Sequence, residues 1–340
     1  MWKKMIALAL AALTIVGCLT ACGGETKPQE NEPAAQTEPA AEAKVLKVLT
    51  LGHSLAVDSG HMLALIANAE GYQDMKVGTL YYSGCPLYRH VEFLKGDSRE
   101  YDLYVSSTTT PNDPPMVTED VSMRDALTFD YWDIIVMQGG VFEIAESLTY
   151  TSGDIQTIQE YVNNNKLNPN AEFIWNMTWV PPVDPDLSAM YPGENNTYVS
   201  NYIRFNNDRA TMYNAVTKCV NDHILTDETF VDMIPSGTAM ENALSSYMEE
   251  KDIHRDYVHA SDIGRVITSY TWFCKLTGVE KLEEIKLDTV PKRFLKSIQN
   301  TEEWVLTDAE KLLVIESVNN ALANPLQVTQ SQYTEAPAAQ

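Results

Sequence analysis

Three side chains at the ends of predicted strands have the types needed for nucleophilic catalysis. Ser54 lies in the turn after an apolar run at 45–51, immediately ahead of a helical pattern. Asp256 and His259 lie three residues apart, beyond the last predicted strand. A serine hydroxyl becomes a nucleophile when a base accepts its proton and a third group orients that base. The spacing therefore predicts that Asp256 orients His259 and that His259 activates Ser54.

A second Asp-x-x-His pair, Asp58 and His61, lies close to Ser54 in the chain. Its position at the start of the first predicted helix suits two other roles, a contact between neighbouring helical turns or a charge–dipole interaction. We favour Asp256 and His259, because that pair follows the last strand and precedes a helix. A histidine must be neutral to accept a proton, so this choice predicts a rate that falls below about pH 6–7.

Apolar runs and helical patterns alternate along the chain, which indicates a parallel sheet covered by helices on both faces. The expected strands are 45–51, 75–82, 134–137, 172–177 and 230–234, and the expected helices are 59–69, 155–162, 205–220, 263–276 and 309–323. This pattern predicts an α/β fold with a central, mostly parallel sheet of about five strands. Ligands of such sheets bind beyond the carboxyl ends of the strands, where the three side chains lie.

The stretch 100–130 interrupts this alternation. It contains the sequence SSTTTPNDPP between two weak strand-like pieces. Connections of this length are usually functional loops, such as binding loops or lids. The alternative is a surface insertion without a role.

The first residues predict export and lipid attachment. Lys3 and Lys4 precede an apolar run at 5–17, which is too short to span a bilayer and fits a secretory signal peptide. Leu19-Thr20-Ala21-Cys22 then resembles the lipobox of bacterial lipoproteins. We therefore expect a signal peptide at 1–21 and a lipid on Cys22. Ile15-Val16-Gly17-Cys18 fits the same pattern four residues earlier, but cleavage before Cys22 gives the apolar run its usual length. An ordinary cleaved signal is the other alternative.

Two further segments lack the apolar periodicity of a folded domain. Residues 22–44 are rich in Glu, Pro, Ala, Gln and Thr and predict a disordered acidic tether. Residues 326–340 predict a disordered tail. One domain at 45–325 remains. We expect the protein to be extracytoplasmic and to contact the membrane through its N-terminal lipid alone.

Charge and cysteine content exclude several classes of function. The chain has 340 residues and a formal net charge of −23, which disfavours nucleic acid and anionic lipid headgroups as partners. Cys85, Cys219 and Cys274 remain after the signal and the anchor are set aside, and they lack metal-ligand spacing. We predict no metal and no cofactor. One disulfide could form among the three, but three small buried residues are the simpler expectation.

Several short motifs together resemble the SGNH (GDSL-type) hydrolases. Gly52-His53-Ser54-Leu55 is similar to the first block of that family, and Asp256-Tyr257-Val258-His259 to its last. The resemblance is closer to a branch of bacterial secreted proteins and extends over about residues 45–280. Further motifs of that branch appear as Ser83-Gly84-Cys85, Val136-Met137-Gln138, Ile234-Pro235-Ser236-Gly237-Thr238-Ala239, Gly264-Arg265 and Leu276-Thr277-Gly278. The resemblance implies a three-layer α/β/α, flavodoxin-like fold and a serine hydrolase acting on ester bonds.

The resemblance also implies a role for each matching residue. Ser54 would be the nucleophile, His259 the general base and Asp256 its orienting carboxylate. The backbone N–H groups of Ser54 and Gly84 would form part of an oxyanion hole. Donors of this kind are worth about 3–4 kcal/mol each to acyl transfer.

Two positions depart from the family pattern. His53 replaces the aspartate of the GDSL block, so the hydrogen bonding there must differ. Gln138 stands where the family usually has an asparagine. Its amide would either complete the oxyanion hole or satisfy buried backbone groups.

Aromatic residues near the end of the fourth predicted strand are candidates for sugar binding. Trp175 lies within the strand and is expected to pack in the core, whereas Trp179 lies beyond it and could stack on a sugar ring. Tyr191 and Tyr198 follow in a Pro-rich loop. We therefore expect an esterase acting on acylated carbohydrate or a small ester. The alternative is a non-catalytic glycan- or solute-binding surface lipoprotein on a degenerate SGNH fold.

Overall fold

The computed structural model describes residues 45–60, 62–72, 74–111, 115–140, 143–184, 205–291 and 303–336. These residues belong to one compact unit that begins at Ala43. The predicted signal peptide and tether with Cys22, and also His61, Tyr191 and Tyr198, lie outside the described residues. Within the described ranges, no helix combines the length and the apolar character needed to cross a membrane.

A seven-stranded sheet forms the middle layer, in the order β4-β3-β2-β1-β5-β6-β7. Its strands are β1 (Val45–Gly52), β2 (Asp74–Tyr81), β3 (Tyr101–Ser107), β4 (Met116–Val121), β5 (Ile134–Gln138), β6 (Glu172–Asn176) and β7 (Phe230–Ile234). β1 pairs in parallel with β2 and β5, and the parallel order continues through β6 and β7. The carboxyl end of β1 is therefore a switch point, where open α/β sheets bind ligands.

The stretch 100–130 contributes an antiparallel edge to this sheet. β3 pairs antiparallel with β2, and β4 pairs antiparallel with β3. Tyr101, Leu103 and Val105 alternate into the apolar core, which gives β3 the two-residue period of a half-buried strand. Instead of a lid or an unstructured insertion, β3 and β4 extend the sheet, which has seven strands rather than about five.

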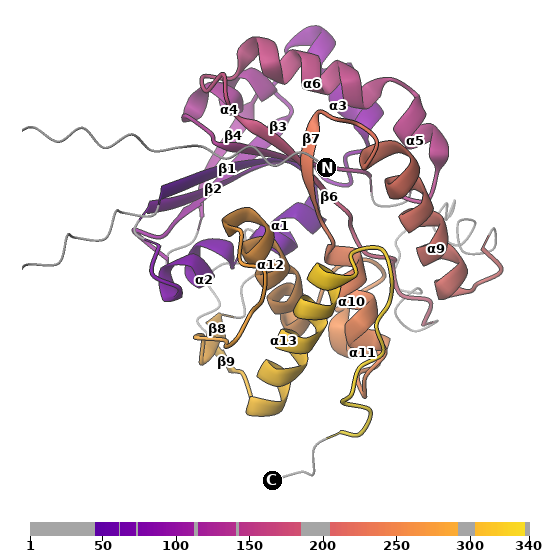
Figure 1. Cartoon of the computed structure of the whole chain (residues 1–340). Helices are drawn as coiled ribbons and strands as arrows, with labels where there is room; N and C mark the ends of the chain where they lie inside the picture. The colour runs from indigo at the N-terminus through magenta and orange to yellow at the C-terminus, as the bar shows by residue number, and fades with distance from the viewer. Residues whose placement is uncertain are drawn as a thin grey trace, which may run out of the picture. The chain divides into compact units, whose positions relative to one another are not determined.

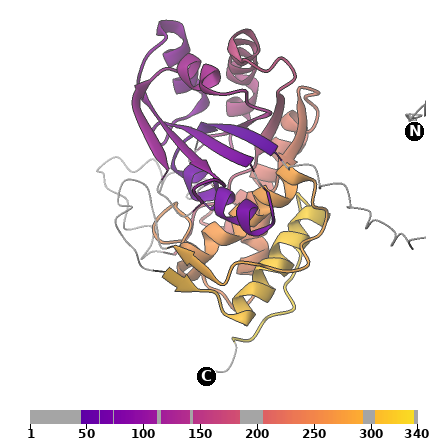
Figure 2. The ribbon, with the colours of Figure 1, turned by 90° about the vertical axis from the view of Figure 1, so that its left-hand side faces the viewer.

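Helices cover both faces of the sheet, as Figures 1 and 2 show. In Figure 1, α1, α2, α10, α12 and α13 lie below the sheet, and α3, α4 and α6 lie above it. The two faces have separate apolar cores, because successive β1 residues such as Val48 and Leu49 point to opposite sides. The predicted three-layer α/β/α fold is thus confirmed. The helices in the described ranges are α1 (Ser54–Gly60), α2 (Leu63–Ala69), α3 (Leu87–Gly96), α4 (Met123–Phe129), α5 (Ser147–Thr151), α6 (Asp154–Asn165), α9 (Arg209–Cys219), the π-helix η1 (Val220–Ile224), α10 (Ser236–Leu244), α11 (Glu250–Ile253), α12 (Asp262–Thr277) and α13 (Asp308–Ala323). In a separate two-stranded sheet, β8 (Thr289–Pro291) pairs antiparallel with β9 (Glu303–Val305).

Residues 326–336 form a polar strap against α10, where the sequence predicted a disordered tail. The backbone N–H of Thr329 donates to Asn242 Oδ1 at 2.8 Å. The N–H of Ser331 donates to Ser245 Oγ at 2.9 Å. The sequence pattern missed the strap because its partners lie on the distant helices α10 and α13, where Glu316 accepts from Ser331 and Gln332, and because only isolated apolar residues such as Leu326 and Tyr333 pack against the core.

Candidate active site

Ser54 begins α1 directly beyond the switch point of the sheet. β1 ends at Gly52, and one residue separates it from the helix. A Cβ on Gly52 would lie 2.8 Å from Ala56 Cβ and 3.1 Å from Gln138 Nε2, so this position has no room for a side chain. The tight strand-to-helix turn therefore depends on glycine and places the Ser54 hydroxyl beyond the end of β1.

The structure brings Ser54, His259 and Asp256 together. His259 Nε2 lies 2.8 Å from Ser54 Oγ, although the two residues are 205 positions apart. His259 Nδ1 lies 2.8 Å from Asp256 Oδ2, and Asp256 Oδ1 accepts the backbone N–H groups of Val258 and His259. Burial alone would raise the pKa of Asp256, but the hydrogen bonds from His259 and these N–H groups hold it far below its usual range. Asp256 therefore stays ionised beside the imidazole.

Asp58, from the alternative Asp-x-x-His pair, bonds to the turn that carries His259. Its carboxylate is fully buried and accepts hydrogen bonds from Arg255 Nη1 and the Ala260 N–H, each at 3.0 Å. No sequence motif singles out Arg255. Its partner is 197 positions away, and no local pattern signals such a pair.

His53 links the turn after β1 to the turn after β5. Its Nε2–H donates to the Gly139 carbonyl at 2.9 Å, and its Nδ1 accepts from the Leu55 N–H at 3.4 Å. Burial lowers the pKa of His53 to about 4, against the opposing effect of the Gly139 hydrogen bond. The side chain that replaces the family aspartate is therefore neutral at pH 7 and fastens two strand ends together.

Gln138 belongs to a buried polar network beneath the Ser54 turn. Its Oε1 accepts from Asn176 Nδ2 at 3.0 Å, so this oxygen satisfies a side chain rather than the backbone. Asn176 Oδ1 in turn accepts from Ser236 Oγ at 2.7 Å and Trp272 Nε1 at 3.2 Å. Among the described residues, Gln138 Nε2 has no hydrogen-bond partner. No sequence motif indicates this network, although the parallel pairing of β5 and β6 places Gln138 beside Asn176.

Gly84 lies in an exposed turn next to the end of β1. The Tyr82 N–H donates to the Gly52 carbonyl at 3.3 Å, which ties this turn to the Ser54 turn. Gly84 has φ +59°, a left-handed conformation that favours glycine. Cys85 beside it is buried, and burial raises the pKa of its thiol. A protonated thiol is a poor nucleophile, so the chemistry of this turn lies in its backbone.

Trp179 is fully buried, which contradicts its predicted role in substrate binding. Its indole Nε1–H donates to the Val258 carbonyl at 2.8 Å. Trp179 therefore supports the turn that holds Asp256 and His259. Trp175 is buried as expected.

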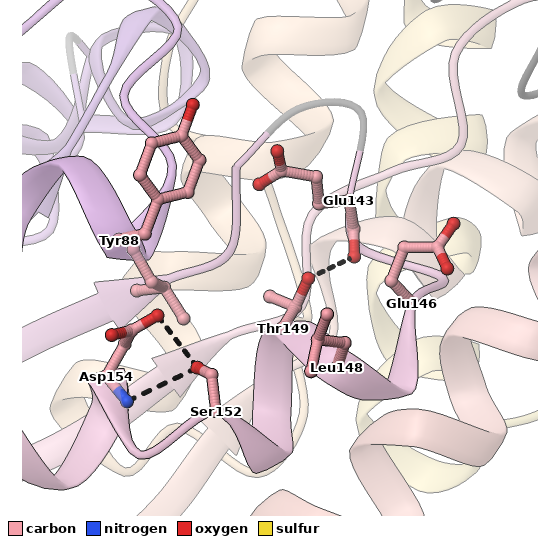
Figure 3. Close-up of a pocket in the computed structure, with 8 residues that line it drawn as sticks. Tyr88, Glu143, Glu146, Leu148, Thr149, Ser152 and Asp154 are labelled. Atoms are coloured by element: carbon pink, nitrogen blue, oxygen red, sulfur yellow. Dashed lines mark hydrogen bonds between the residues drawn. The ribbon is translucent and has the colours of Figure 1, made fainter.

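A cavity of about 510 Å³ lies between the start of α3, which follows the loop after β2, and the segment that runs from the loop after β5 through α5 to the start of α6. Figure 3 shows Tyr88 on one side of it and Glu143 and Glu146 on the other. Its lining residues are Leu87, Tyr88, Glu143, Glu146, Leu148, Thr149, Ser152 and Asp154, and none of the Ser54–His259–Asp256 set is among them. The two loops touch at Gly140, where a Cβ would come within 2.9 Å of Pro86 Cα. The cavity thus adjoins the Gly84 turn. Burial and the nearby Glu146 raise the pKa of Glu143.

Cysteines and metal-ligating residues do not gather at this site. Cys85, Cys219 and Cys274 are free and buried. In the part of the chain that the structure describes, no group of three or more His, Cys, Asp or Glu side chains could hold a metal ion.

Buried histidines make the folded state sensitive to acid. Burial lowers the pKa of His53 to about 4 and those of His90 and His254 to about 3, whereas unfolded histidine titrates near 6.5. The unfolded chain therefore binds more protons between about pH 6.5 and 4, so these groups stabilise the fold fully above pH 6.5 and progressively less as the pH falls. Each pKa unit corresponds to about 1.4 kcal/mol.

Urea unfolding of His90→Asn and wild type between pH 7 and 4.5 measures this effect. Burial raises the pKa values of Asp58 and Glu241, so these carboxyl groups make the fold more stable as the pH falls. Both proteins contain them, so the difference between variant and wild type reports the contribution of His90 alone. Between pH 7 and 4.5, the free energy of unfolding should fall by about 2 kcal/mol less in the variant than in wild type. Parallel pH dependences of the two proteins would contradict the prediction.

Comparisons with known proteins place this fold in a family. Residues 47–301 match the family described as a domain of unknown function, DUF4886. A crystal structure of a DUF4886 family protein from Bacteroides uniformis ATCC 8492 is similar over 86% of this chain and 100% of that chain, with a TM-score of 0.68 and 20% identity. No curated protein matches the sequence.

Two other solved structures are more distant. A candidate SGNH hydrolase from Slackia heliotrinireducens is 17% identical, with a TM-score of 0.40 over 68% of this chain and 98% of that chain. An acetyl xylan esterase is 12% identical, with a TM-score of 0.34 over 68% of this chain and 99% of that chain. The family match covers well over half of the present chain, which therefore belongs to the DUF4886 family.

Proposed function

We propose that this protein is a serine esterase that cleaves carboxylic esters through Ser54, His259 and Asp256. The observation that carries the proposal is the continuous path of hydrogen bonds from Ser54 Oγ through His259 to Asp256, each 2.8 Å long. His259 accepts the Ser54 proton as the oxygen attacks the ester carbonyl, and then donates it to the leaving alcohol. Asp256 stabilises the imidazolium. Water, activated by the same histidine, then hydrolyses the acyl-enzyme.

Acyl transfer also needs donors for the negative charge that develops on the carbonyl oxygen. We assign this role to the backbone N–H groups of Ser54 and Gly84, which follow the adjacent strands β1 and β2. Gln138 lies at the base of the same turn and supports the assignment, because its buried Nε2–H₂ has no acceptor among the described residues. An unsatisfied buried donor costs about 1–3 kcal/mol, a cost that a catalytic role would explain.

For the substrate we propose an acylated carbohydrate or a small ester. Tyr88 takes the stacking role first predicted for Trp179, because it is 47% exposed and lines the cavity beside the Gly84 turn. The carboxylates of Glu143 and Glu146 in the same cavity accept hydrogen bonds from sugar hydroxyls and repel anionic groups. Neutral acylated sugars suit such a lining.

The place of action remains the one expected from the first residues. We propose that the chain is exported, cleaved ahead of Cys22 and held at the membrane by lipid on that cysteine. The basic and apolar residues at 3–17 and the lipobox at 19–22 support this. The domain would then meet its substrates outside the cytoplasm.

A fluorophosphonate probe tests the enzyme proposal, because it forms a stable bond only with an activated serine. We expect wild-type protein to be labelled at Ser54, as located by peptide mass spectrometry, and Ser54→Ala and His259→Gln to remain unlabelled. A folded wild-type protein that is not labelled but still binds glycans would instead favour a non-catalytic binding protein. Labelling at another serine would contradict the assignment of Ser54.

A further inference from the structure

A buried ion pair joins α1 to the turn at 255–260. Asp58 on α1 is fully buried, and its Oδ1 accepts a hydrogen bond from Arg255 Nη1 at 3.0 Å. Its Oδ2 accepts the backbone N–H of Ala260, also at 3.0 Å. The Asp58 carboxylate therefore bonds to the turn on both sides of His259.

Arg255 extends this link to the carboxylate that orients the histidine. Its Nε lies 3.9 Å from Asp256 Oδ2, and its Nη1 also donates to the Ala260 carbonyl. The planar guanidinium presents fixed donors that can bind Asp58 and the turn at once. A lysine ammonium keeps the charge but cannot reproduce that geometry.

From this geometry we infer that Asp58 and Arg255 are positioning residues, which hold the turn with Asp256 and His259 at hydrogen-bond distance from Ser54 and balance the charge around the histidine. The inference rests on the proposed esterase function. Both residues act through Asp256 and His259.

The charge balance follows from the groups around the imidazole. Burial raises the pKa of Asp58 and the Arg255 guanidinium opposes that rise, so each member of the pair depends on the other. Arg255 places a positive charge beside Asp256, Asp58 places a negative charge near the imidazole, and the two charges act there in opposite directions. His53 is buried with a pKa of about 4, so it carries no charge in the working range. The charged and titratable groups near the imidazole include three from its own turn, namely Arg255, Asp256 and Tyr257. Asp58 on α1 and His53, the residue that precedes α1, are the other two.

The test measures kcat/KM for p-nitrophenyl acetate against pH in Arg255→Gln, Asp58→Asn and the double variant. Each single variant should lose about 10- to 100-fold in kcat/KM at pH 8, because the reacting groups are no longer held in register. The midpoint of the acid limb should move up by about half to one pH unit in Arg255→Gln and down by a similar amount in Asp58→Asn. In the double variant the midpoint should return close to the wild-type value while the rate stays low.

Two further variants separate positioning from general loss of structure. Arg209→Gln breaks a similar mostly buried ion network, in which guanidinium nitrogens of Arg209 lie 2.8 Å from carboxylate oxygens of both Glu241 and Glu250. It should lower thermal stability without moving the acid limb. Arg255→Lys, which keeps the charge, should keep the wild-type midpoint and recover only part of the rate.

Failure of this inference is distinguishable from failure of the proposed function. If the wild-type protein hydrolyses no ester and takes up no fluorophosphonate, the esterase proposal falls and the inference falls with it. If wild type is labelled and active, but both single variants keep its midpoint and rate, the inference alone is overturned. Shifts of the same sign in both single variants would also overturn it, because opposite charges must act in opposite directions.

Discussion

Replacing Ser54 with alanine should lower kcat/KM for short-chain aryl esters by at least about a thousandfold. The substitution removes the oxygen that attacks the carbonyl, and neither His259 nor Asp256 can replace it. Ser54 is mostly buried, but its hydroxyl contributes a hydrogen bond to His259 rather than apolar contacts. The fold should therefore persist. Release of p-nitrophenol measures the rate, and thermal unfolding followed by circular dichroism measures the fold.

Ser59→Ala is the matched control for this prediction. Ser59 lies on the same helix, is fully buried, and its Oγ has no hydrogen-bond partner among the described residues. Removing that hydroxyl should leave activity unchanged and stability unchanged or slightly higher. Undiminished turnover in Ser54→Ala would remove Ser54 from the mechanism. A wild-type acid limb that stays flat down to about pH 4 would remove His259.

Alanine at Gly264 or Gly237 should lower the free energy of unfolding by about 3 kcal/mol. A Cβ on Gly264 would lie 2.3 Å from the Ile253 carbonyl oxygen, and one on Gly237 would lie 2.5 Å from the Thr178 oxygen. Both neighbours are backbone atoms, so α12 or α10 would have to move as a whole. Calorimetry should show a melting temperature lower by roughly 6 °C or more.

Gly60→Ala provides the comparison for both substitutions. Gly60 ends α1, and its nearest neighbours would lie 3.6 and 3.7 Å from an added Cβ, at ordinary contact distances. Because alanine favours helix, this variant should be as stable as wild type or more stable by up to about 1 kcal/mol. If Gly264→Ala and Gly60→Ala unfold at the same temperature, close packing at Gly264 does not limit stability.

Local patterns were sufficient to predict the parallel part of the sheet. The run ending at Gly52 is apolar apart from Lys47 and Thr50, and from Val48 onward it forms a central strand buried on both faces. The β3 and β4 edge was harder to predict, because five of the six residues of β4 are exposed and carry no apolar period. The strap at 326–336 was missed for a similar reason, since its partners lie on the distant helices α10 and α13.

The candidate site likewise contains some residues that local sequence predicts and others that only long-range contacts reveal. Residue type and position at strand ends were enough to nominate Ser54 and His259, which the structure places 2.8 Å apart. Trp179 also lies beyond a strand end, but whether such a side chain faces solvent depends on what covers it. Here its partner, the Val258 carbonyl, is 79 positions away. The Arg255–Asp58 pair is separated by a still longer stretch of chain, so only the folded structure identifies it.

The packing of α13 determines how far the chain can be shortened without losing the fold. The family match ends at residue 301, yet Leu313, Val314, Val318 and Ala321 on this later helix are fully buried in the core shared with α10 and α12. Trimming the protein to the matched segment would strip this cover from both helices, and α12 begins three residues after His259. A shortened recombinant form should therefore retain the chain through the strap, because the unit of folding extends further than the unit of family resemblance.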